Sequence, residues 1–124
     1  MSNKILIADD EPNILISLEF LMKREGFEVV LARDGQEAID AIVRERPALV
    51  LLDVMMPVKT GFDVCHEVRA NEAVRDTLIV MLTAKGRDTG VAKGLALGAN
   101  AYMTKPFSTK ELVQKVRELL GGAA

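Results

Sequence analysis

The sequence predicts an α/β protein with a five-stranded parallel sheet and helices on both faces. Five short apolar runs alternate with segments that carry helical patterns, which is typical of right-handed βαβ units. Three of these runs consist almost entirely of Ile, Leu and Val, as expected for strands covered on both faces. The expected strands are KILIA (4–8), FEVVLA (27–32), ALVLLD (48–53), TLIVML (77–82) and NAYMT (100–104).

Helical patterns fill the gaps between these runs. Residues 13–25 form a first helix that ends near Gly26, with an apolar stripe of Ile14, Leu18, Leu21 and Met22. Helix-start signals of the capping-box type pair Asp34 with Glu37, Thr60 with Asp63, and Ser108 with Glu111. The inward residues expected after the first and last of these signals are Ala38, Ala41 and Ile42, and Leu112, Val116 and Leu119.

The segment GRDTGVAKGLALG (86–98) is expected to be the least stable helix. Gly90 and Gly94 lie within it, and each glycine costs a helix about 1 kcal/mol relative to alanine. Packing alone would have to hold this helix in place.

Length and composition predict a single domain in a reducing compartment. A chain of 124 residues is long enough for one core and too short for two ordinary ones. Its net charge of −2 and lack of a Lys/Arg cluster argue against nucleic-acid binding, and no apolar stretch is long enough to span a membrane. The single cysteine, Cys65, cannot form an internal disulfide, which favours the cytoplasm.

We expect the domain to cover residues 1–124, with a core at about 4–120. Residues 121–124, GGAA, would then be a tail or the stump of a linker. The starting Met1 and the absence of a long linker favour a stand-alone protein over an excised domain.

Polar residues follow the expected strands at their carboxyl ends, where open α/β sheets bind ligands. Asp9 and Asp10 follow the first strand and Asp53 ends the third, while Thr83 and Lys105 follow the fourth and fifth. If the first and third strands are neighbours, the three carboxylates crowd one crevice. Such a group would repel strongly, and the absence of Cys and His at the site indicates a hard divalent ion, with Mg²⁺ the best candidate.

Each of these residues also has a simpler interpretation. Asp10 could cap the helix that begins near Pro12, and Asp53 could merely close a strand into a turn. Thr83 could be an ordinary strand residue, and Lys105 a solvated charge. Taken together, these simpler interpretations are less convincing, because unrelated structural roles would not place all of the groups at one edge of one sheet.

Four motifs, ILIADDE, LVLLDVMMP, MLTAKG and YMTKPF, in this order and spacing, resemble the receiver domain of bacterial two-component response regulators. The resemblance runs from about Lys4 to Leu120. It implies the doubly wound, flavodoxin-like fold with strand order 2-1-3-4-5. It also implies a phosphorylation-dependent signalling switch that is not an enzyme in the ordinary sense, since it would catalyse only its own phosphorylation and slow dephosphorylation.

The resemblance assigns a role to each site residue. Asp53 would accept the phosphoryl group from a histidine kinase or histidine phosphotransfer protein. Asp10, Asp53 and the main-chain carbonyl of Met55 would bind Mg²⁺ directly, and Asp9 would act nearby, through water. Thr83 and Lys105 would contact the phosphoryl oxygens.

The resemblance further implies how the switch responds. Thr83 would move toward the phosphoryl group, Ala84 would leave room for it, and the ring of Tyr102 would turn inward. The peptide bond before Pro106 would be cis. The surface of helix 4, strand 5 and helix 5 would then control a downstream output protein or domain, and the protein would be a monomer or a weak dimer through this surface.

The sequence departs from the family pattern in one loop. After Pro57 it reads VKTG, where relatives commonly carry Gly-Met-Asp-Gly or similar, so loop mobility and kinase choice are expected to differ. Met55 and Lys85 flank the line of water attack on a phosphoaspartate and should tune its lifetime.

Other classes of protein fit less well. A haloacid-dehalogenase-type phosphatase needs an Asp at position 55, and ADDEPN would repel the phosphate of a flavin carrier. Walker A and Rossmann glycine patterns are absent. His66 is expected to be a surface residue. The alternative that stays open is a receiver-like adaptor that works without phosphorylation.

Overall fold

A computed structural model describes residues 4–84, 97–105 and 108–121 of the chain. Its sheet has five parallel strands in the order β2-β1-β3-β4-β5, as the resemblance implies. The strands are β1 (Lys4–Ala8), β2 (Glu28–Ala32), β3 (Leu49–Asp53), β4 (Leu78–Ala84) and β5 (Ala101–Lys105). The helices are α1 (Pro12–Arg24), α2 (Gly35–Glu45), α3 (Gly61–Ala70) and α5 (Thr109–Leu119).

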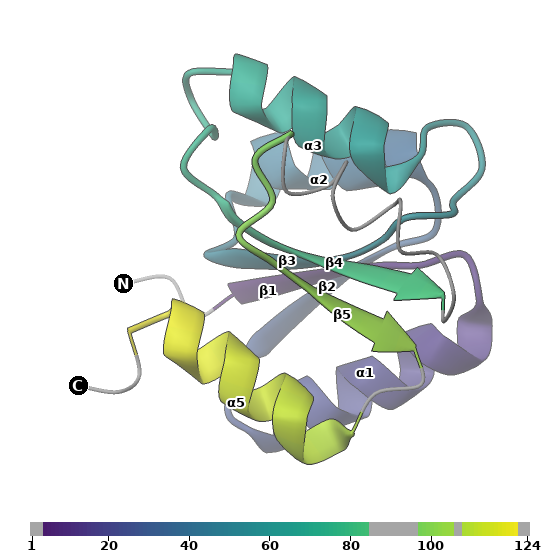
Figure 1. The fold of residues 1–124 in the computed structure, drawn as a ribbon, viewed down its shortest axis with the longest axis vertical. Coiled ribbons are helices and arrows are strands. Elements are labelled where there is room, and N and C mark those ends of the chain that lie inside the picture. Colours follow the sequence, from purple (N-terminus) through teal and green to yellow (C-terminus); the bar gives the residue numbers. More distant parts are fainter. Residues whose placement is uncertain (1–3, 85–96, 106–107, 122–124) are drawn as a thin grey trace.

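The sheet separates two layers of helices (Figure 1), with α2 and α3 on one face and α1 and α5 on the other. Side chains that alternate along a strand therefore enter different cores. In β1, Leu6 packs on the α2/α3 side, whereas Ile5 and Ile7 pack on the α1/α5 side. The continuous apolar sequence of the central strands follows from this burial on both faces.

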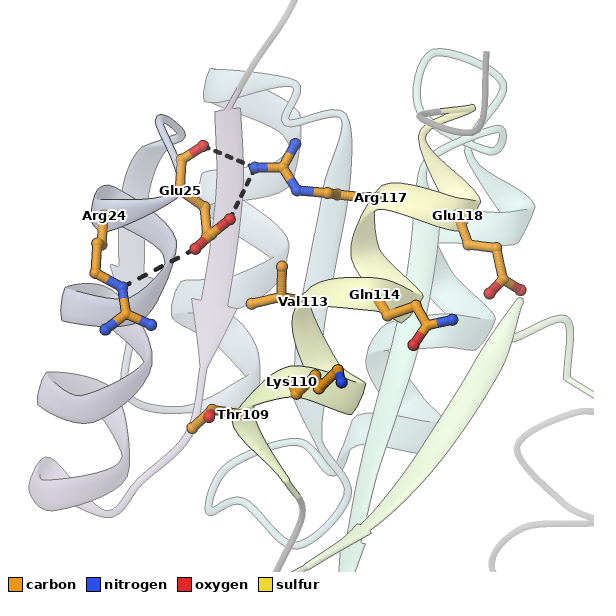
Figure 2. Close-up of a pocket in the computed structure, with 8 residues that line it drawn as sticks. All are labelled: Arg24, Glu25, Thr109, Lys110, Val113, Gln114, Arg117 and Glu118. Carbon is orange, nitrogen blue, oxygen red and sulfur yellow. Dashed lines mark hydrogen bonds and ion pairs between the residues drawn. The ribbon is translucent and has the colours of Figure 1, made fainter.

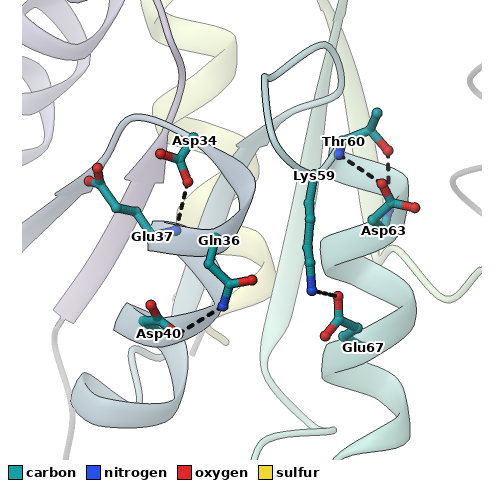
Figure 3. A network of polar contacts seen from close by, with 8 residues as sticks. All are labelled: Asp34, Gln36, Glu37, Asp40, Lys59, Thr60, Asp63 and Glu67. Atoms are coloured by element: carbon teal, nitrogen blue, oxygen red, sulfur yellow. Dashed lines mark hydrogen bonds and ion pairs between the residues drawn. The ribbon is translucent and has the colours of Figure 1, made fainter.

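The predicted helix starts are present, with one difference in detail. Thr60 and Asp63 form a reciprocal capping box, and Asp34 accepts a hydrogen bond from the Glu37 amide (Figure 3). The Glu37 carboxylate, however, accepts from the amide of Arg33 instead of closing the box on Asp34. In α1 the fully buried residue of the first turn is Leu15, not the predicted Ile14, which is half-buried.

The predicted fourth helix lies almost entirely outside the described residues, so Gly90 and Gly94 are not placed. Its last two predicted residues, Leu97 and Gly98, form a turn before β5. The Gly98 φ of 103° is a left-handed conformation that favours glycine.

The Arg69 side chain joins α3 to the beginnings of β4 and β5. Its guanidinium donates to the carbonyls of Arg75 and Thr77, both at 2.7 Å, and to that of Gly98 at 2.9 Å. It also donates to the Asn100 side chain at 2.8 Å. One planar group thereby joins α3 to the segment before β4 and to the segment before β5.

A groove of about 680 Å³ lies between α1 and α5 (Figure 2). At one end of it, Arg117 donates to the carboxylate and the carbonyl of Glu25, at 2.9 and 3.1 Å. These contacts tie the C-terminal ends of the two helices together.

We predict that Arg69→Ala lowers the free energy of unfolding by about 2 kcal/mol, because several carbonyls lose a charged donor. Urea denaturation would measure this loss. The matched control is Arg75→Ala, which keeps the backbone carbonyl that Arg69 contacts and should change stability by no more than about 0.5 kcal/mol. Equal effects of the two substitutions would contradict the prediction.

Candidate functional site

Three carboxylates meet at the carboxyl edge of the sheet. Asp9 follows β1 and Asp53 ends β3, and these strands are neighbours in the sheet. Asp9 and Asp53 are buried, at 0% and 5% exposure, whereas Asp10 is exposed. One oxygen from each carboxylate lies within 4.8 Å of the other two. The strand order therefore brings together residues that are more than forty positions apart in the sequence.

Lys105 is the cation of this cluster. Its Nζ lies 2.9 Å from Asp9 Oδ2 and 3.3 Å from Asp53 Oδ1. Burial favours the neutral amine, but the hydrogen bond that Lys105 donates to Asp9 and the charges of Asp53 and Asp9 outweigh burial and raise the pKa of Lys105. The ammonium thus stays charged and offsets part of the repulsion between the two buried carboxylates.

Asp53 is the carboxyl group of this cluster whose pKa is raised. Burial and, secondarily, the negative charge of Asp9 raise its pKa from 3.8 to about 6. The charge and hydrogen bond of Lys105 and a hydrogen bond from the Met55 amide act in the opposite direction but do not cancel the increase. A cation at this position would favour the ionised form of Asp53.

Asp10 does not cap α1, so that alternative is wrong. The N-cap of α1 is Glu11, whose side chain makes no capping hydrogen bond. The Glu11 amide instead donates to Asp9 Oδ1 at 2.9 Å, which fixes Asp9 and leaves the Asp10 carboxylate exposed beside it.

The other predicted site residues differ in how far they are exposed. Thr83 is buried in β4 next to β3, and Met55 is 52% exposed in the loop after β3. Tyr102 in β5 is 42% exposed. Ala84 is the last residue of β4, and Lys85 and Pro106 lie outside the described residues. His66 on α3 is exposed, as predicted.

Sequence reasoning missed how the loop between β3 and α3 is held. Val58 has a φ of 70°, a rare conformation for a β-branched residue. The backbone of this loop also packs directly against Gly35 at the start of α2. The sequence carried one signal of this, because the loop after Pro57, VKTG, departs from the pattern of the family that the motifs resemble.

The donor set at the strand ends suits Mg²⁺. It offers only oxygen atoms, and two of the three carboxylates are already held in place by backbone and Lys105 contacts. Hard divalent ions prefer such ligands, and Mg²⁺ is satisfied by a few carboxylates together with water and phosphate oxygens. In the part of the chain that the structure describes, no second group of three or more His, Cys, Asp or Glu side chains has this geometry.

The sequence pattern of the response regulator receiver domain family matches residues 5–117. The chain belongs to this family. Receiver domains act in two-component signalling, where phosphorylation is their general switch, and they bind Mg²⁺ at an acidic pocket. None of the helices in the described part of this receiver domain is long and apolar enough to cross a membrane.

Solved structures of receiver domains are similar to this one over nearly the whole chain. A protein described as a response regulator from Chloroflexus aurantiacus has 34% identity and a TM-score of 0.93, covering 98% of this chain and 99% of its own. The chemotaxis response regulator CheY4 of Vibrio cholerae has 31% identity and a TM-score of 0.89, with coverages of 96% and 99%.

A third structure was solved with its metal. It is the receiver domain of the sensor histidine kinase PA1611 from Pseudomonas aeruginosa, which has a magnesium ion coordinated in the active-site cleft. It shares 30% identity and a TM-score of 0.89 with this receiver domain and covers 98% of this chain and 99% of its own.

We predict that, without Mg²⁺, the receiver domain loses stability as the pH rises from about 4 to about 6. The folded state raises the pKa of Asp53 from 3.8 to about 6, so between these values it binds more protons than the unfolded state, and deprotonation destabilises it. The loss should be on the order of 2 to 3 kcal/mol. Denaturation at a series of pH values would measure it.

Asp53→Asn should remove most of this slope and make the metal-free domain more stable at neutral pH. The control is Asp76→Asn, at an exposed carboxyl group far from the cluster, which should leave the slope unchanged. An identical pH profile for the unaltered domain and Asp53→Asn would refute the assignment of the slope to Asp53.

Proposed function

We propose that this receiver domain is a phosphorylation-dependent switch in which Asp53 accepts a phosphoryl group. The observation that carries the proposal is the cluster at the sheet edge, where Asp9, Asp10 and Asp53 lie within 4.8 Å and Lys105 contacts two of them. The donor is a histidine kinase or a histidine phosphotransfer protein, and the protein acts in the cytoplasm.

Asp53, Lys105 and Thr83 have separate roles in the proposed phosphoryl transfer. An oxygen of Asp53 attacks phosphorus, and the P–N bond of the donor breaks, returning its electron pair to the imidazole, which then takes a proton from solvent. Asp53 needs no base of its own once it is ionised, so positioning and charge stabilisation are the main requirements. Lys105 and Thr83 contact the phosphoryl oxygens, the first through charge and the second through a hydrogen bond.

Asp10, Asp53 and the Met55 carbonyl would hold Mg²⁺ directly, with Asp9 nearby. When bound, the ion supplies positive charge between the carboxylates and the phosphoryl oxygens. Asp9 is already engaged by the Glu11 amide and Lys105, which is consistent with an indirect role through water. The reaction is limited to phosphorylation and slow dephosphorylation of the domain itself.

The switch is proposed to run through Thr83 and Tyr102 to the outer surface of β5 and α5. A phosphoryl group adds close to two negative charges, and Thr83 moves toward it. Tyr102, now 42% exposed, then has room to turn inward. The changed surface controls an output protein or domain and can support a weak dimer. Helix 4, which completes this surface in the proposal, falls outside the described residues.

We predict that incubation with Mg²⁺ and acetyl phosphate adds the mass of one phosphoryl group to the peptide that contains Asp53. Asp53→Asn should abolish the adduct, because an amide oxygen is a far weaker nucleophile toward phosphorus than a carboxylate. Asp40→Asn, a surface substitution on α2, should leave it intact. If Asp53 stays unmodified while the domain still binds its output partner, the phosphorylation-independent adaptor is the better description.

We also predict that a phosphoryl mimic such as beryllofluoride, added with Mg²⁺, changes amide hydrogen exchange in residues 97–105 and in α5. Exchange in residues 40–45, the second half of α2, serves as the internal control, because α2 lies on the opposite face of the sheet from α5. Equal exchange of β5 and α5 in both states would argue against this route for the signal.

A further inference from the structure

The loop between β3 and α3, residues 54–60, contains a strained turn. The Lys59 amide donates to the Pro57 carbonyl at 2.8 Å, and Val58 between them has a φ of 70°. A three-residue turn with positive φ at its centre is rare and strained, and a β-branched residue increases the strain. The Val58 side chain is 75% exposed, so little burial offsets this cost. Other contacts must hold the turn.

The start of α2 supplies the first of these contacts. The Gly35 amide donates to the Pro57 carbonyl at 3.3 Å, the same oxygen that closes the turn. Gly35 also has no room for a side chain. An added Cβ would overlap the Lys59 carbonyl oxygen and lie 2.5 Å from the Lys59 Cβ and 2.6 Å from its carbonyl carbon. Because most of these atoms are backbone, the loop itself would have to move.

Two further contacts hold the loop between α2 and α3. Lys59 Nζ pairs with Glu67 of α3 at 2.6 Å, with its stem running between the two helices (Figure 3). Met56 is buried in the same core cluster as Ala38 and Ile42 of α2. Helix α2 therefore contacts the loop at two places, the buried side chain of Met56 and the turn at residues 57–59.

The base of the loop is joined to Asp53. The Gly61 amide donates to the Val54 carbonyl at 2.8 Å, and an added Cβ on Gly61 would lie 2.6 Å from the Asp53 carbonyl oxygen. The Met55 amide hydrogen-bonds the Asp53 side chain. A displacement of the Lys59 backbone would therefore be transmitted through a few tightly packed residues to Met55 and Asp53.

We propose that Gly35, on a helix that contributes no group to the site, is a positioning residue for metal binding. By admitting the backbone of Lys59, it keeps the Val58 turn in its strained form and sets the Met55 main chain beside Asp53. The inference rests on the proposed function, in which the Met55 carbonyl is a Mg²⁺ ligand.

The test is the Mg²⁺ dissociation constant of the full chain, measured by chemical-shift titration of backbone amides without a phosphodonor. Gly35→Ala should weaken Mg²⁺ binding about three- to tenfold, although all three carboxylates remain. Gln36→Ala, at the next position of the same helical turn, should leave affinity unchanged. Unchanged affinity in a folded Gly35→Ala domain would overturn the proposal.

A second variant tests the path through the turn. Val58→Gly relieves the backbone strain and should raise the Tm by a few degrees. Because the turn is then no longer held in one conformation, the Lys59 amide is less firmly positioned, and Mg²⁺ binding should weaken two- to threefold. In the Val58→Gly background, Gly35→Ala should cost less affinity than in the unaltered chain, because the freed turn can move aside. Equal costs in the two backgrounds would overturn the coupling.

The remaining outcomes are also decisive. If Gly35→Ala does not fold, Val58→Gly alone decides, and a Mg²⁺ affinity equal to that of the unaltered chain refutes the positioning role of the turn. If the unaltered chain does not bind Mg²⁺, both the proposed metal site and this inference fail. If the unaltered chain binds Mg²⁺ and the Gly35 and Val58 variants bind it with the same affinity, this inference fails and the proposed metal site stands.

Discussion

The burial of Asp9 and Asp53, two carboxylates that repel each other at one sheet edge, is the constraint on which the rest of this structure depends. Asp9 and Asp53 are both buried and both contact Lys105, which comes from the edge strand β5. Burial and, secondarily, the charge of Asp9 raise the pKa of Asp53 to about 6. A site that destabilises the metal-free fold in this way is suited to bind a divalent cation, because the ion relieves the same repulsion.

The parallel sheet makes this concentration of charge possible. All five strands run in one direction, so their carboxyl ends meet at one edge, and residues far apart in the sequence become neighbours. The two cores then hold the strands from both faces, and the loop after β3 packs into the core on the α2/α3 side. Packing against α2 therefore helps to hold the loop that borders the site.

The fold and the cluster could be predicted from sequence because they follow from periodicity and strand-end position. The apolar runs located the strands to within two residues, and Asp9, Asp10, Asp53 and Lys105 meet where the strand order requires. The Gly35 and Val58 contacts could not be predicted in this way. They depend on how closely two backbones approach, and no pattern of residue types in one sequence encodes that distance. Leu15 replaced Ile14 in the core for a similar reason, since periodicity does not fix the rotation of a helix to one residue.

The Arg69 contacts have a consequence for tolerance to sequence drift. Three of its four partners are main-chain carbonyls, so the side chains at positions 75 and 77 can diverge without loss of the interaction. Gly98 has no such freedom, because its φ of 103° and the guanidinium packed against it exclude a side chain. Lysine cannot substitute for Arg69 either, since a single ammonium cannot reach carbonyls spread around a planar fork. Natural variation around Arg69 should therefore be uneven, permissive at positions 75 and 77 and restricted at Arg69 and Gly98.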